Sequence, residues 1–259
     1  MEKEIKVPLL VFLTDFGTKD GFAGVMKGVA LNINPLIQPV DLTHEIESFN
    51  ILEGALVLKA HYKYFPKGSI FVAVVDPGVG TERKPIAVRT ENYYFVAPMN
   101  GLLDLVLEEE KPIEVVEIAN PKYRLNMVNN TFHGRDIFTP AAAYISKGVP
   151  LEELGPKINY QKMLNFPKPH QEENKIIGQI LYFDKFGNAI TNIPCSKFKK
   201  CRWRSLEGKV VENFLSGEKG IPSFICGSFG YIEIFLPMDS FKEKYNPQVG
   251  DKVECFLEG

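Results

Sequence analysis

The stretch SIFVAVVDPGVGTER, residues 69–83, contains an apolar run that ends abruptly in an aspartate, a proline and two glycines. A run of β-branched and aromatic residues without alternation is typical of a central strand covered on both faces. Ligands bind at the carboxyl ends of strands in open α/β sheets, which makes Asp76 a candidate functional residue. An Asx-type turn, in which Asp76 only accepts backbone hydrogen bonds, suits the position equally well, and the stretch alone leaves both interpretations open.

A second apolar stretch, VPLLVFL at residues 7–13, predicts another strand, which ends in the loop TDFGTKDG. Asp15 stands at the tip of this strand, after Thr14, at a position with little structural purpose. Asp20 is a plausible N-cap for a helix that continues to about residue 33, and a ligand role is an equal alternative.

The strand IQPVDL and the segment THEIESF lead into a helix predicted over about residues 50–62. Asn50 and Glu53 stand in capping-box spacing, which explains both without a function. Phe49, just before the cap, is either a hydrophobic staple, which its spacing slightly favours, or the wall of a pocket.

Strands are predicted at about 85–90 and 93–97 as a hairpin, and Asn100 or Gly101 is expected to begin a helix. The loop NNTFHGRDIFTP, residues 129–140, precedes an alanine-rich helix that begins at Thr139 or, one turn earlier, at Asp136. Such a density of titratable groups beside a glycine is unusual for a simple connection.

The composition changes near residue 165, where FPKPHQEENK is followed by short β-like runs without helical periodicity. We therefore predict an α/β domain with a largely parallel central sheet over residues 1–168 and a smaller all-β domain over residues 169–259. Two glycine-containing turns stand out in the second domain, FDKFGNAITN and CGSFGYIE, and ordinary turn chemistry explains each of them.

The composition is that of an ordinary globular protein of 259 residues with a net charge of −2. No basic stripe is present, so a small-molecule substrate is favoured over nucleic acid. The apolar stretch near the N-terminus is too short to span a membrane and offers no cleavage site, which predicts a cytoplasmic protein. The four cysteines form no CxxC pair and are expected to be free buried thiols.

Two reactive sets can be proposed from residue types: Asp76, Arg83 and His133, and the scattered carboxylates of Asp15, Asp20 and Asp184. No HxH, HExxH, GxSxG or GxxxxGK[ST] motif is present, which disfavours the common metal hydrolases, serine hydrolases and nucleotide-phosphate sites. A metal-dependent hydrolase that uses Asp15, Asp76 and His133 stays open as an alternative.

Taken together, the motifs resemble the S-adenosyl-L-methionine hydroxide adenosyltransferases, the water-using relatives of the fluorinases and chlorinases. They are TDFGTKDGFAGVMKG, DLTHEI, VVDPGVGTER, APMNGLL, NNTFHGRDIFTPAAA, FDKFGNAITNI and GSFGYIEI. The resemblance covers nearly the whole chain in the same order. It implies hydrolysis of S-adenosylmethionine to adenosine and L-methionine without a metal or cofactor. It also implies a homotrimer whose sites lie between the N-terminal domain of one subunit and the C-terminal domain of its neighbour.

The resemblance also assigns roles to individual residues. The water-activating triad corresponds to Asp76, Arg83 and His133. The residues implied in substrate binding are Asp15 on the ribose hydroxyls, Asp20 and Asp184 on the ammonium, Asn188 on adenine, Phe49, Phe132 and Phe186 against the adenosyl moiety or sulfonium, Ser228 on the methionine carboxylate, and the segment containing Glu233 and Met238. Phe229 occupies a place where the halogenating relatives carry an arginine, which leaves the neutralisation of the substrate carboxylate unexplained.

The halogenases carry uncharged side chains where this chain has Asp76 and His133, and the negative charge of Asp76 disfavours a halide. In the implied reaction, Arg83 lowers the pKa of a water, His133 is a possible proton acceptor, and Asp76 orients the pair. A non-catalytic trimer that binds S-adenosylmethionine and a halogenase are the alternatives.

Overall fold

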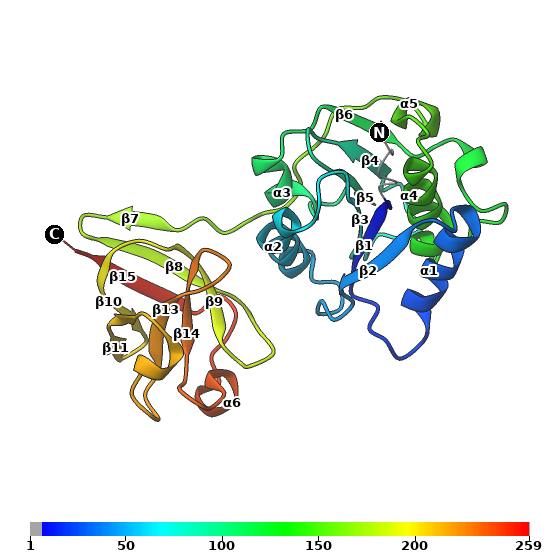
Figure 1. Ribbon diagram of the computed structural model, residues 1–259. Helices are drawn as coiled ribbons and strands as arrows, with labels where there is room; N and C mark the ends of the chain where they lie inside the picture. Colours follow the sequence, from blue (N-terminus) through cyan, green and yellow to red (C-terminus); the bar gives the residue numbers. More distant parts are fainter. Residues whose placement is uncertain (1–6, 259) are drawn as a thin grey trace, which may run out of the picture. The chain divides into compact units, whose positions relative to one another are not determined.

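The structure is a computed structural model that describes residues 7–258. The chain divides into two compact units between Leu164 and Asn165, whereas the sequence places the boundary at 168/169. Each unit has its own sheet (Figure 1). The N-terminal unit has two hydrophobic core clusters and the C-terminal unit has one, and the units are described separately below.

The N-terminal unit contains a six-stranded sheet. Four strands that lie side by side, β2, β1, β3 and β5, are parallel, and β4 is antiparallel to both of its neighbours. The predicted α/β class is therefore confirmed, as is the hairpin of β4 and β5. In spatial order, the strands are β2 (Gln38–Thr43), β1 (Leu9–Thr14), β3 (Ile70–Val74), β5 (Tyr94–Pro98), β4 (Pro85–Arg89) and β6 (Glu114–Glu117).

Helices cover both faces of this sheet (Figure 1). Leu10 and Phe12 of β1 pack in a core with α1 (Phe22–Ile33), α4 (Thr139–Ser146) and α5 (Leu151–Leu154). Val11 and Leu13 point to the opposite core with α2 (Ile51–His61) and α3 (Asp104–Glu109). Every residue of β3 is buried, as an apolar run without alternation predicts for a strand covered on both faces.

Three predicted helix starts had different outcomes. Asn50 caps α2, with its side chain accepting a hydrogen bond from the backbone N–H of Glu53, as predicted. Asp20 is not the N-cap of α1, because Gly21 occupies that position in a left-handed conformation with φ 75°. The helix expected at Asn100 or Gly101 begins only at Asp104.

The C-terminal unit is a nine-stranded, almost entirely antiparallel sheet, which confirms the predicted all-β class. One short helix, α6 (Phe241–Tyr245), packs Phe241 against Trp203 in the core. The strands are β7 (His170–Glu172), β8 (Lys175–Phe183), β9 (Ala189–Pro194), β10 (Phe198–Trp203), β11 (Leu206–Gly208), β12 (Val210–Val211), β13 (Ser223–Cys226), β14 (Tyr231–Phe235) and β15 (Lys252–Leu257).

The expectation of free thiols is wrong, because all four cysteines form disulfides. Cys201 and Cys255 are register partners on the neighbouring strands β10 and β15, with a Cα–Cα distance of 4.0 Å. Cys195 and Cys226 lie 5.5 Å apart, measured between Cα atoms. The partners are 54 and 31 residues apart in sequence, so only the strand pairing brings them together.

Within residues 7–258, no helix combines the length and apolar character needed to cross a membrane.

Candidate functional site

Polar residues gather at the carboxyl ends of the parallel strands in the N-terminal unit. Thr14 of β1 and Val74 of β3 are register partners, so Asp15 and Asp76 leave neighbouring strands at the same edge of the sheet. Asn100 follows β5, and its amide donates a 2.8 Å hydrogen bond to the carbonyl of Val75. The residue before Asp76 is therefore held by a side chain from the neighbouring strand end, and the edge has the usual position of an α/β ligand site.

Asp76, Arg83 and His133 form one connected group, which we call the triad. Arg83 Nε donates to Asp76 Oδ1 at 2.9 Å, and Arg83 Nη2 pairs with Asp76 Oδ2. The same Nη2 lies 3.0 Å from His133 Nδ1. The side chains of Arg83 and Asp76 are only 7% and 4% exposed, so the ion pair is shielded from solvent. The residues that the sequence proposed as one reactive set are brought together.

The hydrogen bonds define the protonation state of the triad. A guanidinium can only donate, so His133 Nδ1 must accept from Arg83, and a neutral imidazole then carries its proton on Nε2. Burial and the positive charge of Arg83 lower the pKa of His133, which favours this neutral form. Arg83 Nη1 is buried and has no hydrogen-bond partner among the described residues. The triad therefore retains a cationic donor for a small polar ligand.

Close backbone packing places His133 beside the 76–83 turn. Gly80 has φ +77°, and a Cβ atom there would lie 2.3 Å from the carbonyl oxygen of Asn130. Only glycine allows the two loops to approach this closely. His133 then stands immediately before a π-helix, Gly134–Phe138, whose buried Asp136 accepts the backbone N–H of Asn129 at 2.7 Å. Irregular helices of this kind occur often at functional sites.

Asp15 is half-buried beside the triad. Its Oδ2 accepts the backbone N–H of Phe49 at 2.8 Å, and burial, together with the charge of Asp76, raises its pKa. Phe49 has a positive φ of 68° and is 71% exposed, which is not the burial that a hydrophobic staple requires. Phe132 packs edge-to-face against Phe16 and Phe22, while Asp20 is exposed.

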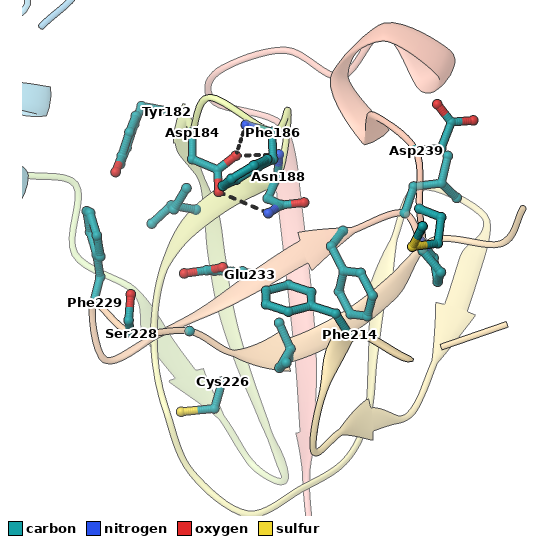
Figure 2. A pocket seen from close by; sticks show the side chains of 17 residues that line it. Tyr182, Asp184, Phe186, Asn188, Phe214, Cys226, Ser228, Phe229, Glu233 and Asp239 are labelled. Carbon is teal, nitrogen blue, oxygen red and sulfur yellow. Dashed lines mark hydrogen bonds between the residues drawn. The ribbon is translucent and has the colours of Figure 1, made fainter. Parts of the chain in front are cut away.

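A second set of predicted residues lines a pocket of about 720 Å³ in the C-terminal unit (Figure 2). Asp184 organises the turn after β8, because its Oδ1 accepts the backbone N–H groups of Phe186 and Asn188 and its Oδ2 accepts the Asn188 amide. The turn role that the sequence favoured is thus real. It leaves the side chain of Phe186 75% exposed on the pocket wall.

Glu233 lies in the middle of this pocket, between the turn that carries Asp184 and the turn that carries Ser228 (Figure 2). Its residue is 6% exposed, and burial, with the nearby Asp184, raises its pKa to about 7. A Cβ atom at Gly227 would lie 1.7 Å from Glu233 Oε1, so any other residue there would displace the Glu233 side chain. Phe229 lines the pocket beside Tyr182, and Met238 is 89% exposed at its rim.

Sequence reasoning missed residues in both sites, and three of them are informative. Asn100 was assigned to a helix start, although its position after a predicted strand was the signal for an edge residue. Tyr182 and Phe214 line the pocket, but in the sequence they belong to ordinary strand-like runs without a motif. Among the described residues, no group of three or more His, Cys, Asp or Glu side chains is placed to hold a metal ion.

The fold and the sites define a class of two-domain enzymes. The α/β unit carries a buried Asp–Arg–His group at its strand ends, and the all-β unit carries a mainly apolar pocket. Models of the SAM hydroxide adenosyltransferase N-terminal and C-terminal domains match residues 10–155 and 178–254. The chain belongs to the SAM hydroxide adenosyltransferase family.

Individual relatives agree with this assignment. An (R)-S-adenosyl-L-methionine hydrolase of Methanocaldococcus jannaschii is 35% identical, over 95% of each chain. A fluorinase of an Actinoplanes species is 29% identical, over 94% of this chain and 95% of the relative. The crystal structure of an uncharacterized conserved protein from Thermotoga maritima superposes with a TM-score of 0.88 at 36% identity, covering 95% of this chain and 99% of that one.

Proposed function

We propose that this protein hydrolyses S-adenosyl-L-methionine to adenosine and L-methionine, with the triad as the site that positions and activates the water. The observation that carries this proposal is the buried Nη1 of Arg83, a cationic donor without a partner in the described part of the chain, in a group that also holds a neutral histidine. The proposal is also supported by the family and by the relative named as a hydrolase of this substrate.

The reaction needs mainly a water molecule that is correctly positioned, because the leaving thioether is neutral. The water oxygen bonds to C5′ and loses a proton to solvent, while the C5′–S electron pair moves to sulfur and yields a neutral thioether. Arg83 lowers the pKa of the water, and His133 Nε2–H donates to its oxygen. A proton acceptor role for His133 is disfavoured, because its Nδ1 already accepts from Arg83. Asp76 orients Arg83 through two hydrogen bonds.

Substrate contacts are proposed at both units. Asp15 accepts hydrogen bonds from the ribose hydroxyls, and Phe49 and Phe132 pack against the adenosyl group or the sulfonium. Asp20 and Asp184 attract the ammonium, and Asn188 contacts the adenine edge. In the pocket, Phe186, Ser228, Phe229, Glu233 and Met238 contribute the remaining contacts. The raised pKa of Glu233, about 7, reduces the repulsion that a substrate carboxylate meets there.

We further propose a homotrimer in which the N-terminal unit of one subunit meets the C-terminal unit of its neighbour. The triad and the pocket lie on different units, and a shared site would use both. Sedimentation equilibrium tests this assembly. Mixing Asp76→Ala protein with a pocket variant such as Asn188→Ala should restore activity, because some interfaces in mixed trimers would carry two intact halves.

No metal or cofactor is proposed to take part, and the partner is a small molecule rather than nucleic acid or a membrane. The decisive experiment is chromatography of purified protein incubated with S-adenosylmethionine. Adenosine and methionine in equal amounts are expected, with no loss of activity in EDTA. Tight binding without products would indicate a sensor, and a halogenated nucleoside formed in the presence of halide would indicate a halogenase. An EDTA-sensitive reaction would indicate a metal-dependent hydrolase.

A cytoplasmic location also stays a proposal. The two disulfides argue against this location, because reducing compartments keep most thiols free. Alkylation of thiols in intact cells before lysis, followed by mass spectrometry of the four cysteines, tests whether the disulfides form in the native compartment.

A further inference from the structure

Two loops at the carboxyl edge of the N-terminal sheet are joined by buried hydrogen bonds that the proposed reaction does not use directly. Thr14 ends β1 and is 0% exposed, and His44 follows β2 and is 4% exposed. Thr14 Oγ1 lies 2.7 Å from His44 Nδ1, and His44 Nε2 lies 2.8 Å from Asp41 Oδ1. Lys27 of α1 pairs with the other oxygen of Asp41. We call this set the Thr14–His44–Asp41 chain.

The direction of each hydrogen bond follows from the available donors. Burial raises the pKa of Asp41, but hydrogen bonds from Lys27 and His44 outweigh it and leave that pKa lowered, so the carboxylate is ionised and His44 Nε2–H donates to it. The backbone N–H of Phe16 donates to Thr14 Oγ1 at 3.2 Å. The Thr14 hydroxyl proton is then free to donate to His44 Nδ1. Each of these groups therefore has a hydrogen-bond partner.

The Thr14–His44–Asp41 chain combines a hydroxyl, an imidazole and a carboxylate, as the catalytic groups of many hydrolases do. Its placement in the fold rules out a nucleophilic role. The Thr14 side chain is fully buried, so no substrate carbon can reach its oxygen. At the other end of the Thr14–His44–Asp41 chain, the side chain of Asp41 is 40% exposed. The chain therefore acts on the neighbouring backbone.

That backbone carries Asp15. Thr14 and Phe16, on either side of Asp15, are both bound through the Thr14 hydroxyl, and the N–H of Gly17 donates to the carbonyl of His44 at 2.7 Å. Asp15 itself contacts the same second loop through the N–H of Phe49. The carboxylate is therefore fixed by the connection between the loops that follow β1 and β2.

We propose that His44, acting through Thr14, is a positioning residue that aims the Asp15 carboxylate at the two ribose hydroxyls of an adenosyl ligand. This inference rests on the proposed function, which gives Asp15 that ligand. A carboxylate accepts two hydrogen bonds from a vicinal diol only when both oxygens are aligned, so a small displacement of the loop weakens both contacts.

The test compares Thr14→Val, which keeps the shape and removes the hydroxyl, with Thr14→Ser, which keeps the hydroxyl. Calorimetric affinities for adenosine and for 2′,3′-dideoxyadenosine are measured on each variant and on Asp15→Ala. We expect Thr14→Val to weaken adenosine about tenfold and to leave the dideoxy ligand nearly unchanged, while Thr14→Ser retains the wild-type ratio of affinities. His44→Ala should show the same selective loss, and it replaces Thr14→Val as the test variant if that protein does not fold.

The Asp15→Ala variant separates the two levels of the proposal. If Asp15→Ala leaves the affinity ratio at its wild-type value, the ribose assignment of Asp15 is wrong and the positioning role falls with it. If Asp15→Ala removes the discrimination but Thr14→Val and His44→Ala keep it, only the positioning role is overturned. Equal weakening of both ligands in those two variants also overturns it, because that result reports general damage to the site.

Discussion

Arg83 Nη2 lies 3.0 Å from His133 Nδ1, and the same guanidinium pairs with Asp76 through Nε and Nη2. The contact works only while the imidazole is an acceptor at Nδ1, because a protonated ring would point an N–H at a guanidinium N–H. His133 is therefore held neutral, with its remaining N–H on Nε2.

Replacement of His133 should separate the acceptor role of its Nδ1 from the donor role of its Nε2–H. His133→Ala is expected to lower kcat by about 10²–10³ and to change KM for S-adenosylmethionine only a few-fold, since its Nε2–H is a donor to the attacking water. His133→Asn can still accept from Arg83 but has no group at the position of Nε2, so it should be similarly impaired. Steady-state kinetics check both variants, with the exposed His170→Ala as the control. Full activity in His133→Asn would mean that Nε2 has no part in the reaction.

Turnover should fall only under acidic conditions. Burial and Arg83 lower the pKa of His133 from its ordinary value of 6.5, so the neutral form persists below that pH in the folded protein. We expect kcat to be insensitive to this group above pH 6.5 and to decrease as the pH falls through the lowered pKa. A kcat profile measured from pH 4 to pH 9 checks this. An acid limb centred above pH 6.5 would contradict the assignment.

The sequence predicted the triad better than the surroundings of the triad. The run 70–75 indicated a buried strand, and β3 is fully buried, because apolar β-branched residues have few other places in a folded chain. The contact between Arg83 and His133 joins residues 50 apart, and the sequence groups them only by residue type and by the family resemblance. Periodicity carries no information about contacts over such a separation.

Two of three misses share a physical cause in tertiary contacts. Asp20 satisfied the preference for an N-cap, yet Gly21 adopts the cap position. Asn100 bonds to the carbonyl before Asp76 instead of beginning a helix. Cys201 and Cys255 pair because strands β10 and β15 are neighbours, which their spacing in the sequence does not reveal. Local propensity decides neither of the last two positions.

The two disulfides should stabilise the C-terminal unit. Removing either pair, by Cys195→Ser with Cys226→Ser or by Cys201→Ser with Cys255→Ser, is expected to cost about 2–4 kcal/mol in free energy of unfolding. The pair 201/255 closes the longer loop and should cost slightly more. Urea unfolding with and without reductant measures both. Reagent titration of the denatured, unreduced protein should find no reactive thiol, and four reactive thiols would show that the disulfides do not form in solution.

The buried Glu233 should make the stability of the protein decrease towards alkaline pH. Its pKa rises from 4.5 to about 7 on folding, so the folded state binds more protons than the unfolded state between these values. The stabilisation that protonated Glu233 contributes is complete below pH 4.5 and is lost as the pH rises through 7, with a total on the order of 2–3 kcal/mol.

Glu233→Gln resembles the protonated form and should flatten the dependence of Tm on pH between 5 and 8. Glu212→Gln, at an exposed position of the same unit, is the matched control and should keep the wild-type slope. If Glu233→Gln also keeps that slope, the glutamate is ionised in the folded pocket, and the reduced repulsion proposed for the substrate carboxylate must come from another group.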